Sequence, residues 1–251
     1  MKTAYVALRD SPHYRKDIFE SGLRRLGYVI DSAVRPPKEQ DVLVIWNRYG
    51  VYHERAREFE KVGAKVLVTE NAYLGREDLG GDEHWLALSL NHHCGAGTWF
   101  QGDNSRWDDL NVKLEPWRYG GNETVVLRQR GIGEPGVAMP KTWTAPGRIR
   151  QHPGKKEAGI PLDKDLANAS AVITWASGAG IRAVMMGIPV FYALDKWIGG
   201  PAGRHISLYG KEPALKSDEA RTNMLRRLIW AQWRRSEIAS GEAFETIFRC
   251  S

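Results

Sequence analysis

Cysteines, long apolar runs and internal repeats are scarce or missing in this sequence. The 251 residues include only two cysteines, Cys94 and Cys250, which are too few and too far apart for a disulfide framework or a cysteine-rich metal centre. No run of about eighteen apolar residues occurs, so the sequence predicts no transmembrane helix and no insertion into a membrane. The first residues also lack the apolar core and cleavage site of a signal peptide. We therefore expect a cytoplasmic protein.

The positive charge is concentrated in the second half of the chain. Residues 126–251 carry 19 lysines and arginines against 11 acidic residues, whereas the first 125 residues carry 17 against 19. A basic half suits a polyanionic ligand, such as nucleotide phosphates, nucleic acid or an anionic membrane surface. A merely soluble basic surface explains the same numbers, so charge alone does not decide between these interpretations.

Short apolar runs alternate with helical patterns through both halves of the chain. The runs are those of buried strands, at residues 3–8, 41–46, 65–69, 123–127, 148–152, 171–175 and 189–193. This alternation is typical of a parallel sheet whose strands are connected by helices. We therefore expect an α/β fold with two Rossmann-like parallel-sheet domains, residues 1–120 and 121–251, which face a central cleft. The second domain should end in a long basic helix at 217–235 and a further helix near the terminus.

Residues 74–122 show little periodicity and are rich in glycine, tryptophan, histidine and asparagine. We expect this segment to decorate the cleft. Its aromatic side chains could stack on sugars or bases, or could simply pack in a core; they are Trp85, Trp99, Trp107 and Trp117. The run His92-His93-Cys94 has no fourth ligand at a suitable spacing, so no metal site is predicted.

Polar side chains directly follow each strand of the first half. They are Arg9, Asp10 and Ser11 after the first strand, Asn47 and Arg48 after the second, and Glu70 and Asn71 after the third. Ligands of parallel sheets bind beyond the carboxyl ends of the strands, so we expect these residues to line one wall of the cleft. Asp10 and Glu70 are the two candidates for a general base. Each could equally cap a helix or pair with Arg9 or Arg48.

The strongest local pattern is a strand, a Ser-Gly turn and a helix, in AVITWASGAGIRAVMMGIPVFY. Gly178 and Gly180 would let backbone N–H groups approach an anion, and Ser177 adds a hydroxyl donor at the positive end of the helix. Tight packing of an ordinary strand–helix turn is the alternative. His152, fixed by Pro153 at the end of another strand, could donate to the same phosphate and balance charge on a departing group. The basic residues around it are Arg148, Arg150, Lys155 and Lys156.

These segments resemble a known family. The HPG at His152, the DLANAS that follows and the Ser177 turn are similar to the C-terminal domain of GT-B glycosyltransferases, and closest to the capsule-polysaccharide and Kdo-transferase-like group. In the first half, Trp46-Asn47-Arg48 and KVLVTENAYLG are similar to that group's Trp-Gly-Arg and Glu-Asp-Gly-Phe-Leu segments. The matching pieces cover about a third of the chain.

The resemblance implies a donor site in the second domain and an acceptor side in the first. It implies that His152 and Ser177 hold the donor's phosphate and that Thr174 and Gly178 line the site. It also implies that the loop from Arg128 to Gly131, which includes Arg130, faces the donor across the cleft. Many GT-B enzymes hold the donor's ribose with an acidic residue on the helix after the turn. This chain has Arg182 there, so the nucleoside is not identified.

The sequence therefore predicts a glycosyltransferase that moves a sugar from a nucleotide sugar to an acceptor hydroxyl, without a metal or other cofactor. Two acceptors fit. One is a hydroxymethylated base in double-stranded DNA, flipped against the loop aromatics, as in a phage-type DNA-modifying glycosyltransferase. The other is a saccharide or lipid-linked acceptor. The rival interpretation is a non-catalytic nucleotide- or nucleic-acid-binding protein on the same scaffold.

Overall fold

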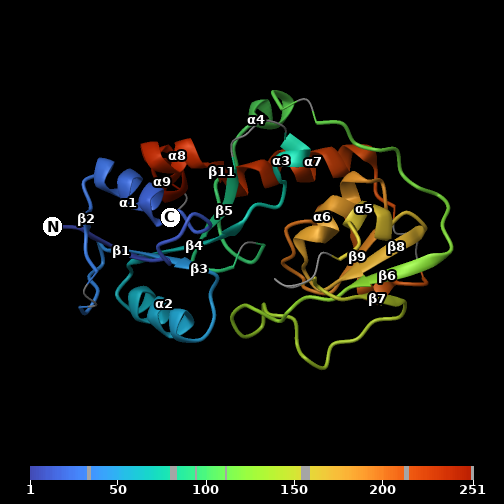
Figure 1. Ribbon diagram of the computed structural model, residues 1–251, viewed down its shortest axis with the longest axis horizontal. Coiled ribbons are helices and arrows are strands. Elements are labelled where there is room, and N and C mark those ends of the chain that lie inside the picture. Colours follow the sequence, from blue (N-terminus) through green and yellow to red (C-terminus); the bar gives the residue numbers. More distant parts are fainter. Residues whose placement is uncertain are drawn as a thin grey trace. The chain divides into compact units, whose positions relative to one another are not determined.

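The computed structural model describes residues 1–32, 35–79, 84–93, 95–110, 112–153, 159–211 and 215–249 (Figure 1). The chain divides into two compact units. Unit 1 comprises Met1–Asp103, Gly133–Pro135 and Ile229–Ser251, and unit 2 comprises Asn104–Ile132 and Gly136–Leu228. The division expected near residue 120 differs from this one, because the end of the chain belongs to unit 1.

Unit 1 is built on a six-stranded sheet. Its strands are β1 (Thr3–Ala7), β2 (Val29–Ile30), β3 (Val42–Trp46), β4 (Lys65–Asn71), β5 (Trp85–Leu90) and β11 (Gln232–Arg234), in the order β11-β5-β4-β3-β1-β2. The first four strands are parallel, whereas β5 is antiparallel to β4 and β11 is antiparallel to β5. The three strands predicted here are present. The strand β5 was not predicted, because all six of its residues are buried and no alternation marks it.

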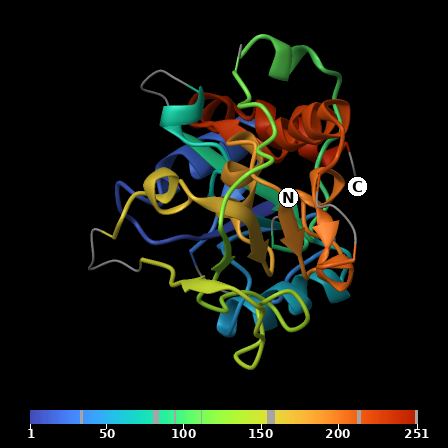
Figure 2. The same cartoon turned by 90° about the vertical axis from the view of Figure 1, so that its right-hand side faces the viewer.

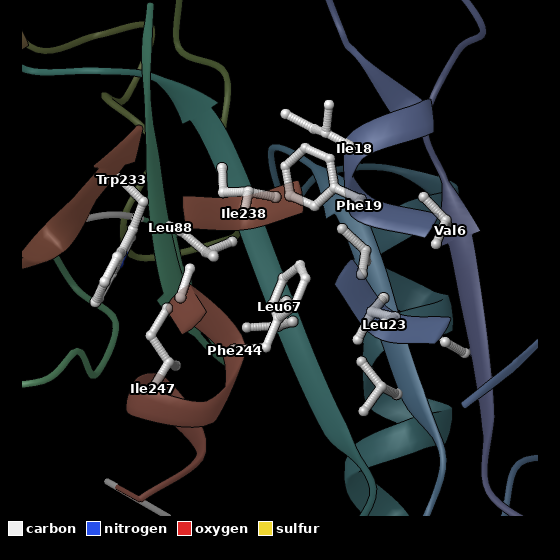
Figure 3. Close-up of a cluster of buried hydrophobic side chains, with 14 of the residues drawn as sticks. Val6, Ile18, Phe19, Leu23, Leu67, Leu88, Trp233, Ile238, Phe244 and Ile247 are labelled. Carbon is white, nitrogen blue, oxygen red and sulfur yellow. The ribbon is translucent and has the colours of Figure 1, made fainter. Parts of the chain in front are cut away.

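Helices cover both faces of the unit 1 sheet. Figure 1 shows α1 (Lys16–Arg25), α8 (Arg235–Ser240) and α9 (Glu242–Phe248) on one face and α2 (Val51–Lys61) on the other. A short α3 (Arg76–Leu79) precedes β5. Separate apolar clusters fill the two faces, and the larger one joins strand residues to Phe19, Trp233 and Phe244 (Figure 3). Burying one large apolar side chain contributes about 1.5–3 kcal/mol, so these clusters supply the main stabilisation of unit 1.

The end of the chain differs from the long basic helix predicted at 217–235. The helix α7 (Asp218–Leu228) ends in a 3-10 turn, Ile229–Ala231, and Gln232–Arg234 then forms β11. Gln232 and Trp233 are fully buried and Arg234 is exposed. The side chain of Gln232 accepts hydrogen bonds from the N–H groups of Tyr73 and Leu74. These tertiary bonds override the local helical pattern.

Gly22 allows α1 to lie directly against the C-terminal helices. A Cβ atom at this position would lie 2.0 Å from the carbonyl oxygen of Ile238 and 2.7 Å from a ring carbon of Phe244. Alanine is the better helix former by about 1 kcal/mol, but the clash with backbone should outweigh it. We expect Gly22→Ala to lower the free energy of unfolding by about 1–3 kcal/mol in urea titrations. Gly120→Ala, where nothing lies within 4 Å, is the matched control, and equal effects of both would contradict this reading.

Unit 2 is built on a parallel five-stranded sheet. Its strands are β6 (Glu123–Leu127), β7 (Arg148–Arg150), β8 (Ala169–Thr174), β9 (Val190–Tyr192) and β10 (Arg204–His205), in the order β10-β9-β8-β6-β7. Its helices besides α7 are α4 (Ser105–Asp108), α5 (Leu162–Asp165), α6 (Gly178–Met185), and the 3-10 turns Gly200–Ala202 and Ile206–Leu208. Residues 128–147, all described, join β6 to β7 with neither helix nor strand (yellow-green in Figure 2). The predicted α/β class, with two sheets of mainly parallel strands, is confirmed.

Candidate functional site

The Ser177 turn joins β8 to α6 through a fixed set of hydrogen bonds. The Ser177 hydroxyl caps α6 by accepting from the N–H of Ala179 at 3.1 Å, and the Ser177 N–H donates to Oγ1 of Thr174 at 3.0 Å. Thr174 is fully buried, so it anchors the turn to the sheet. A Cβ on Gly180 would lie 2.8 Å from the ring of Trp197, which explains the glycine. The serine oxygen acts only as an acceptor here, which leaves its hydrogen able to donate to a ligand.

Gln129, which lies in the predicted donor-facing loop from Arg128 to Gly131 but was not singled out there, completes this turn. Its side-chain oxygen accepts from the N–H of Ala176 at 2.8 Å, and it follows β6, the neighbour of β8 in the sheet. Next to it, the indole N–H of Trp175 donates to the carbonyl of Val137 at 2.8 Å. A polar residue directly after a buried strand was the available signal for Gln129. The turn is therefore held by side chains from two neighbouring strands.

The other residues predicted to bind the nucleotide-sugar donor lie at several places in unit 2. Arg128 donates to the carbonyls of Lys141 and Trp143, so it braces the 128–147 connection. Arg130 and His152 are exposed, and burial together with the charge of Arg130 lowers the pKa of His152. Gly131 has a φ of 69°, Gly178 begins α6, and Arg182 is half-buried on it. Of the basic residues around His152, Arg148 and Arg150 form ion pairs with Glu123 and Asp165. Lys155 and Lys156 lie outside the described residues.

Unit 1 contains a cluster of two histidines and two carboxylates. Nε2 of His93 lies 3.0 Å from Oε2 of Glu70, which points from β4 to the face that α2 covers. Glu134 accepts the backbone N–H of His93 at 3.2 Å and lies 3.1 Å from Nδ1 of His92, both through Oε1. Nδ1 of His93 accepts the backbone N–H of Arg48 at 3.3 Å. Of the residues predicted for this wall, the structure thus brings Glu70 and the backbone of Arg48 to one histidine.

The side chain of Arg48 lies inside unit 1, not on an acceptor-binding surface. It is 2% exposed and forms a two-pronged ion pair with Glu60 at 2.6 and 2.7 Å, and it also donates to the carbonyl of Asn91. The preceding Asn47 has a φ of 60°, in the left-handed region of backbone conformation. Its side-chain oxygen is buried without a partner among the described residues.

The remaining residues predicted for this wall stand apart from the cluster. Arg9, Asp10 and Asn71 are exposed, and Ser11 accepts the N–H of Tyr14 at 3.5 Å. None of the described contacts joins Arg9, Asp10 or Ser11 to Glu70. The unit 1 site is therefore centred on Glu70, His93 and Glu134.

The protonation of this cluster is perturbed by its surroundings. Burial lowers the pKa of His93, but the carboxylates of Glu70 and Glu134 outweigh it, so the net pKa is raised. Burial raises the pKa of Glu134, but hydrogen bonds from His92 and from backbone N–H groups outweigh it and the net pKa is lowered. Within the described residues, no group of three or more histidine, cysteine, aspartate or glutamate side chains is placed to hold a metal ion.

Two tryptophans proposed as stacking surfaces are core residues. Trp85 and Trp107 are 8% and 5% exposed, since Trp85 belongs to β5, whose six residues are all buried, and Trp107 is the buried residue of α4. Trp99 and Trp117 are partly exposed. The aromatic argument for a flipped base therefore loses two of its four residues.

Comparison of structures finds similar proteins, whereas comparison of sequences with family models and curated proteins does not. No protein-family model matches the chain, and a search of curated protein sequences finds no match. Among solved structures, KpsC of Thermosulfurimonas dismutans, a beta Kdo 2,7 transferase, is similar with a TM-score of 0.56, 12% identity and complete coverage of both chains. The likeness shows a shared fold. A beta Kdo 2,4 transferase KpsC from the same organism is matched with a TM-score of 0.49, 13% identity and 91% of each chain.

The likeness extends over the whole chain and not only over the motifs. Complete coverage of both chains shows that the fold resembles that of this Kdo transferase beyond the Ser177 turn and the segments near Trp46. In the described part of the chain, no helix is long and apolar enough to cross a bilayer.

Proposed function

We propose that this protein is a glycosyltransferase that takes its sugar from a nucleotide sugar. The observation that supports the proposal is the Ser177 turn, in which a capped helix begins at Gly178 and the Ser177 hydroxyl accepts from the N–H of Ala179, so its hydrogen can donate to an anion. The fold shared with a Kdo transferase supports the same reaction class. A phosphate oxygen would accept from the Ser177 hydroxyl and from the N–H of Gly178 at the positive end of α6.

In the proposed reaction, Glu70 is the general base. It removes the proton of the acceptor hydroxyl, and the freed electron pair forms a bond to the anomeric carbon of the sugar. The bond from that carbon to the donor's phosphate oxygen breaks, and the phosphate keeps that electron pair. This route applies to transfer with inversion. Glu70 is favoured over the exposed Asp10 because His93 orients its carboxylate.

For the acceptor, we propose a saccharide ahead of DNA. The DNA interpretation rested on the basic charge and on aromatic side chains that could stack on a flipped base, but two of those aromatic residues, Trp85 and Trp107, are buried. Retention of the protein on a duplex with hydroxymethylated bases at about 50 mM salt, lost at higher salt, would restore the DNA acceptor.

Variants of Ser177 separate phosphate binding from helix capping. We expect UDP, GDP or CMP, or one of their sugars, to raise the melting temperature of the wild-type protein. Ser177→Thr keeps the hydroxyl and should keep that shift. Ser177→Asp also keeps a cap for α6, because its carboxylate accepts the N–H of Ala179, but its charge repels phosphate and should abolish the shift.

The comparison of the aspartate and threonine variants decides this test. If Ser177→Asp folds with wild-type stability and still responds to the nucleotide, Ser177 does not contact phosphate and the proposed donor site is wrong. If no nucleotide or nucleotide sugar of the panel shifts the wild-type protein, the transferase proposal itself fails. Nucleotide binding without sugar transfer would instead favour the non-catalytic binding protein.

A further inference from the structure

One oxygen of Glu134 is buried without a hydrogen-bond partner among the described residues. The Glu134 side chain is 3% exposed, and its Oε1 is occupied by His92 and by the backbone N–H of His93. Its Oε2 is unpaired. An unsatisfied buried acceptor costs about 1–3 kcal/mol, and more when it is charged. Such an atom needs an explanation, and a donor that is present in only one state of the protein would supply one.

His93 is the residue placed to supply that donor. Its side chain is 12% exposed, and its Nδ1 lies 4.0 Å from Oε2 of Glu134. At present Nδ1 accepts the backbone N–H of Arg48 over a long 3.3 Å, while Nε2 faces Glu70 at 3.0 Å. A backbone N–H cannot accept a hydrogen bond, so neutral His93 carries its proton on Nε2 and donates it to Glu70.

A second proton on Nδ1 would rearrange these contacts. The bond from the Arg48 N–H would be lost, and the new N–H would point toward the unpaired oxygen of Glu134. The imidazolium would then lie between two carboxylates in a largely buried site, where their attraction is strong. The other charged groups nearby are directed elsewhere, since the Arg48 guanidinium pairs with Glu60 and contacts His53, and His92 binds Oε1 of Glu134.

We propose that Glu134, His93 and Glu70 form a proton relay that controls the general base, with Glu134 as the positioning residue that holds His93 and accepts from its Nδ1 once protonated. The assignment of Glu70 as base rests on the proposed function, whereas the pairing of Glu134 with protonated His93 does not. The proton on Nδ1 comes from solvent, and no other covalent bond is made or broken. When His93 is charged, the carboxylate of Glu70 is held in an ion pair, so we expect sugar transfer to decline on the acid side.

The titration of His93 in NMR spectra tests the pairing directly. The protein has seven histidines, and His93→Gln identifies the signals of His93. We expect the wild-type ring to titrate above its ordinary value of about 6.5 and to carry its proton on Nε2 when neutral. In Glu134→Gln the midpoint should fall by about one pH unit, a tenfold weaker binding of the proton. Glu134→Asp keeps the charge, so its His93 midpoint should lie between those of the wild-type protein and Glu134→Gln.

The controls separate an electrostatic role from a structural one. Glu54→Gln removes an exposed carboxylate from α2 and should leave the His93 midpoint unchanged. An unchanged midpoint in a folded Glu134→Gln protein overturns the relay, as does a neutral ring protonated on Nδ1. If the midpoint moves as expected but Glu70→Gln still transfers sugar, the pairing stands and the assignment of Glu70 as base fails.

Protonation of His93 should also make the stability of unit 1 depend on pH. Because His93 binds a proton more tightly in the folded chain than in the unfolded chain, the proton stabilises the fold fully below about pH 6.5. This contribution is lost as the pH rises through the higher midpoint of folded His93. Glu134→Gln should reduce this pH dependence together with the NMR midpoint; a pH dependence that Glu134→Gln leaves intact would count against the relay.

Discussion

Arg48→Ala should lower the free energy of unfolding of unit 1 by about 3–5 kcal/mol. The loss arises because Glu60, 31% exposed, would keep a charge without its partner and the carbonyl of Asn91 would lose its donor. Arg48→Lys keeps the charge but not the two-pronged geometry, so it should be intermediate. Urea denaturation, followed by hydrogen exchange at amides of the unit 1 sheet, measures the effect.

A surface ion pair provides the control for Arg48. Arg24 pairs with Glu20 at 3.0 Å, but its side chain is 56% exposed. We expect Arg24→Ala to cost less than about 1 kcal/mol, because solvent screens such pairs. If Arg48→Ala costs no more than Arg24→Ala, the buried pair with Glu60 does not stabilise the fold, and Arg48 becomes available again as a ligand-binding residue.

Trp233→Ala should cost about 3–5 kcal/mol, since it removes the largest fully buried side chain from the main apolar cluster. Trp233 pairs with Leu86 across β11 and β5, so the amides of β5 should lose protection against hydrogen exchange. Trp233→Phe should cost less, because it refills part of the cavity. Trp143→Ala, which truncates a partly exposed tryptophan of unit 2, is the control and should leave the amides of β5 protected.

The parts of the fold with regular local patterns were predictable from the sequence. The strand at Glu123–Leu127 was predicted with its observed ends, and the Ser177 turn lies between the predicted strand and helix. Period and turn residues are local, so a single sequence reveals them. The strand β11 was read as helix because the bonds that select a strand come from residues 158 and 159 positions away.

The unit 1 site was predictable only in part, for a similar reason. Glu70 could be chosen because it follows a buried strand. Its partner His93 and the buried Glu134 lie 41 positions apart in the sequence, and no motif spacing links the two. Arg48 was predicted to line the cleft because it follows a strand end, but its side chain is buried, and the preceding Asn47 has a positive φ. Side-chain direction after a strand therefore needs the backbone geometry that a sequence does not contain.

The placement of β11 in the sheet of unit 1 also constrains the order in which the protein can mature. Gln232 bonds to Tyr73 across 159 residues, so the N-terminal sheet keeps an open edge at β5 while unit 2 is being translated. At about 5–20 residues per second, a ribosome needs about 8–30 s to cover that interval. During this time the apolar strand β5 is a target for chaperones or for mispairing, and release of a chain cut before Ile229 should yield an aggregation-prone unit 1.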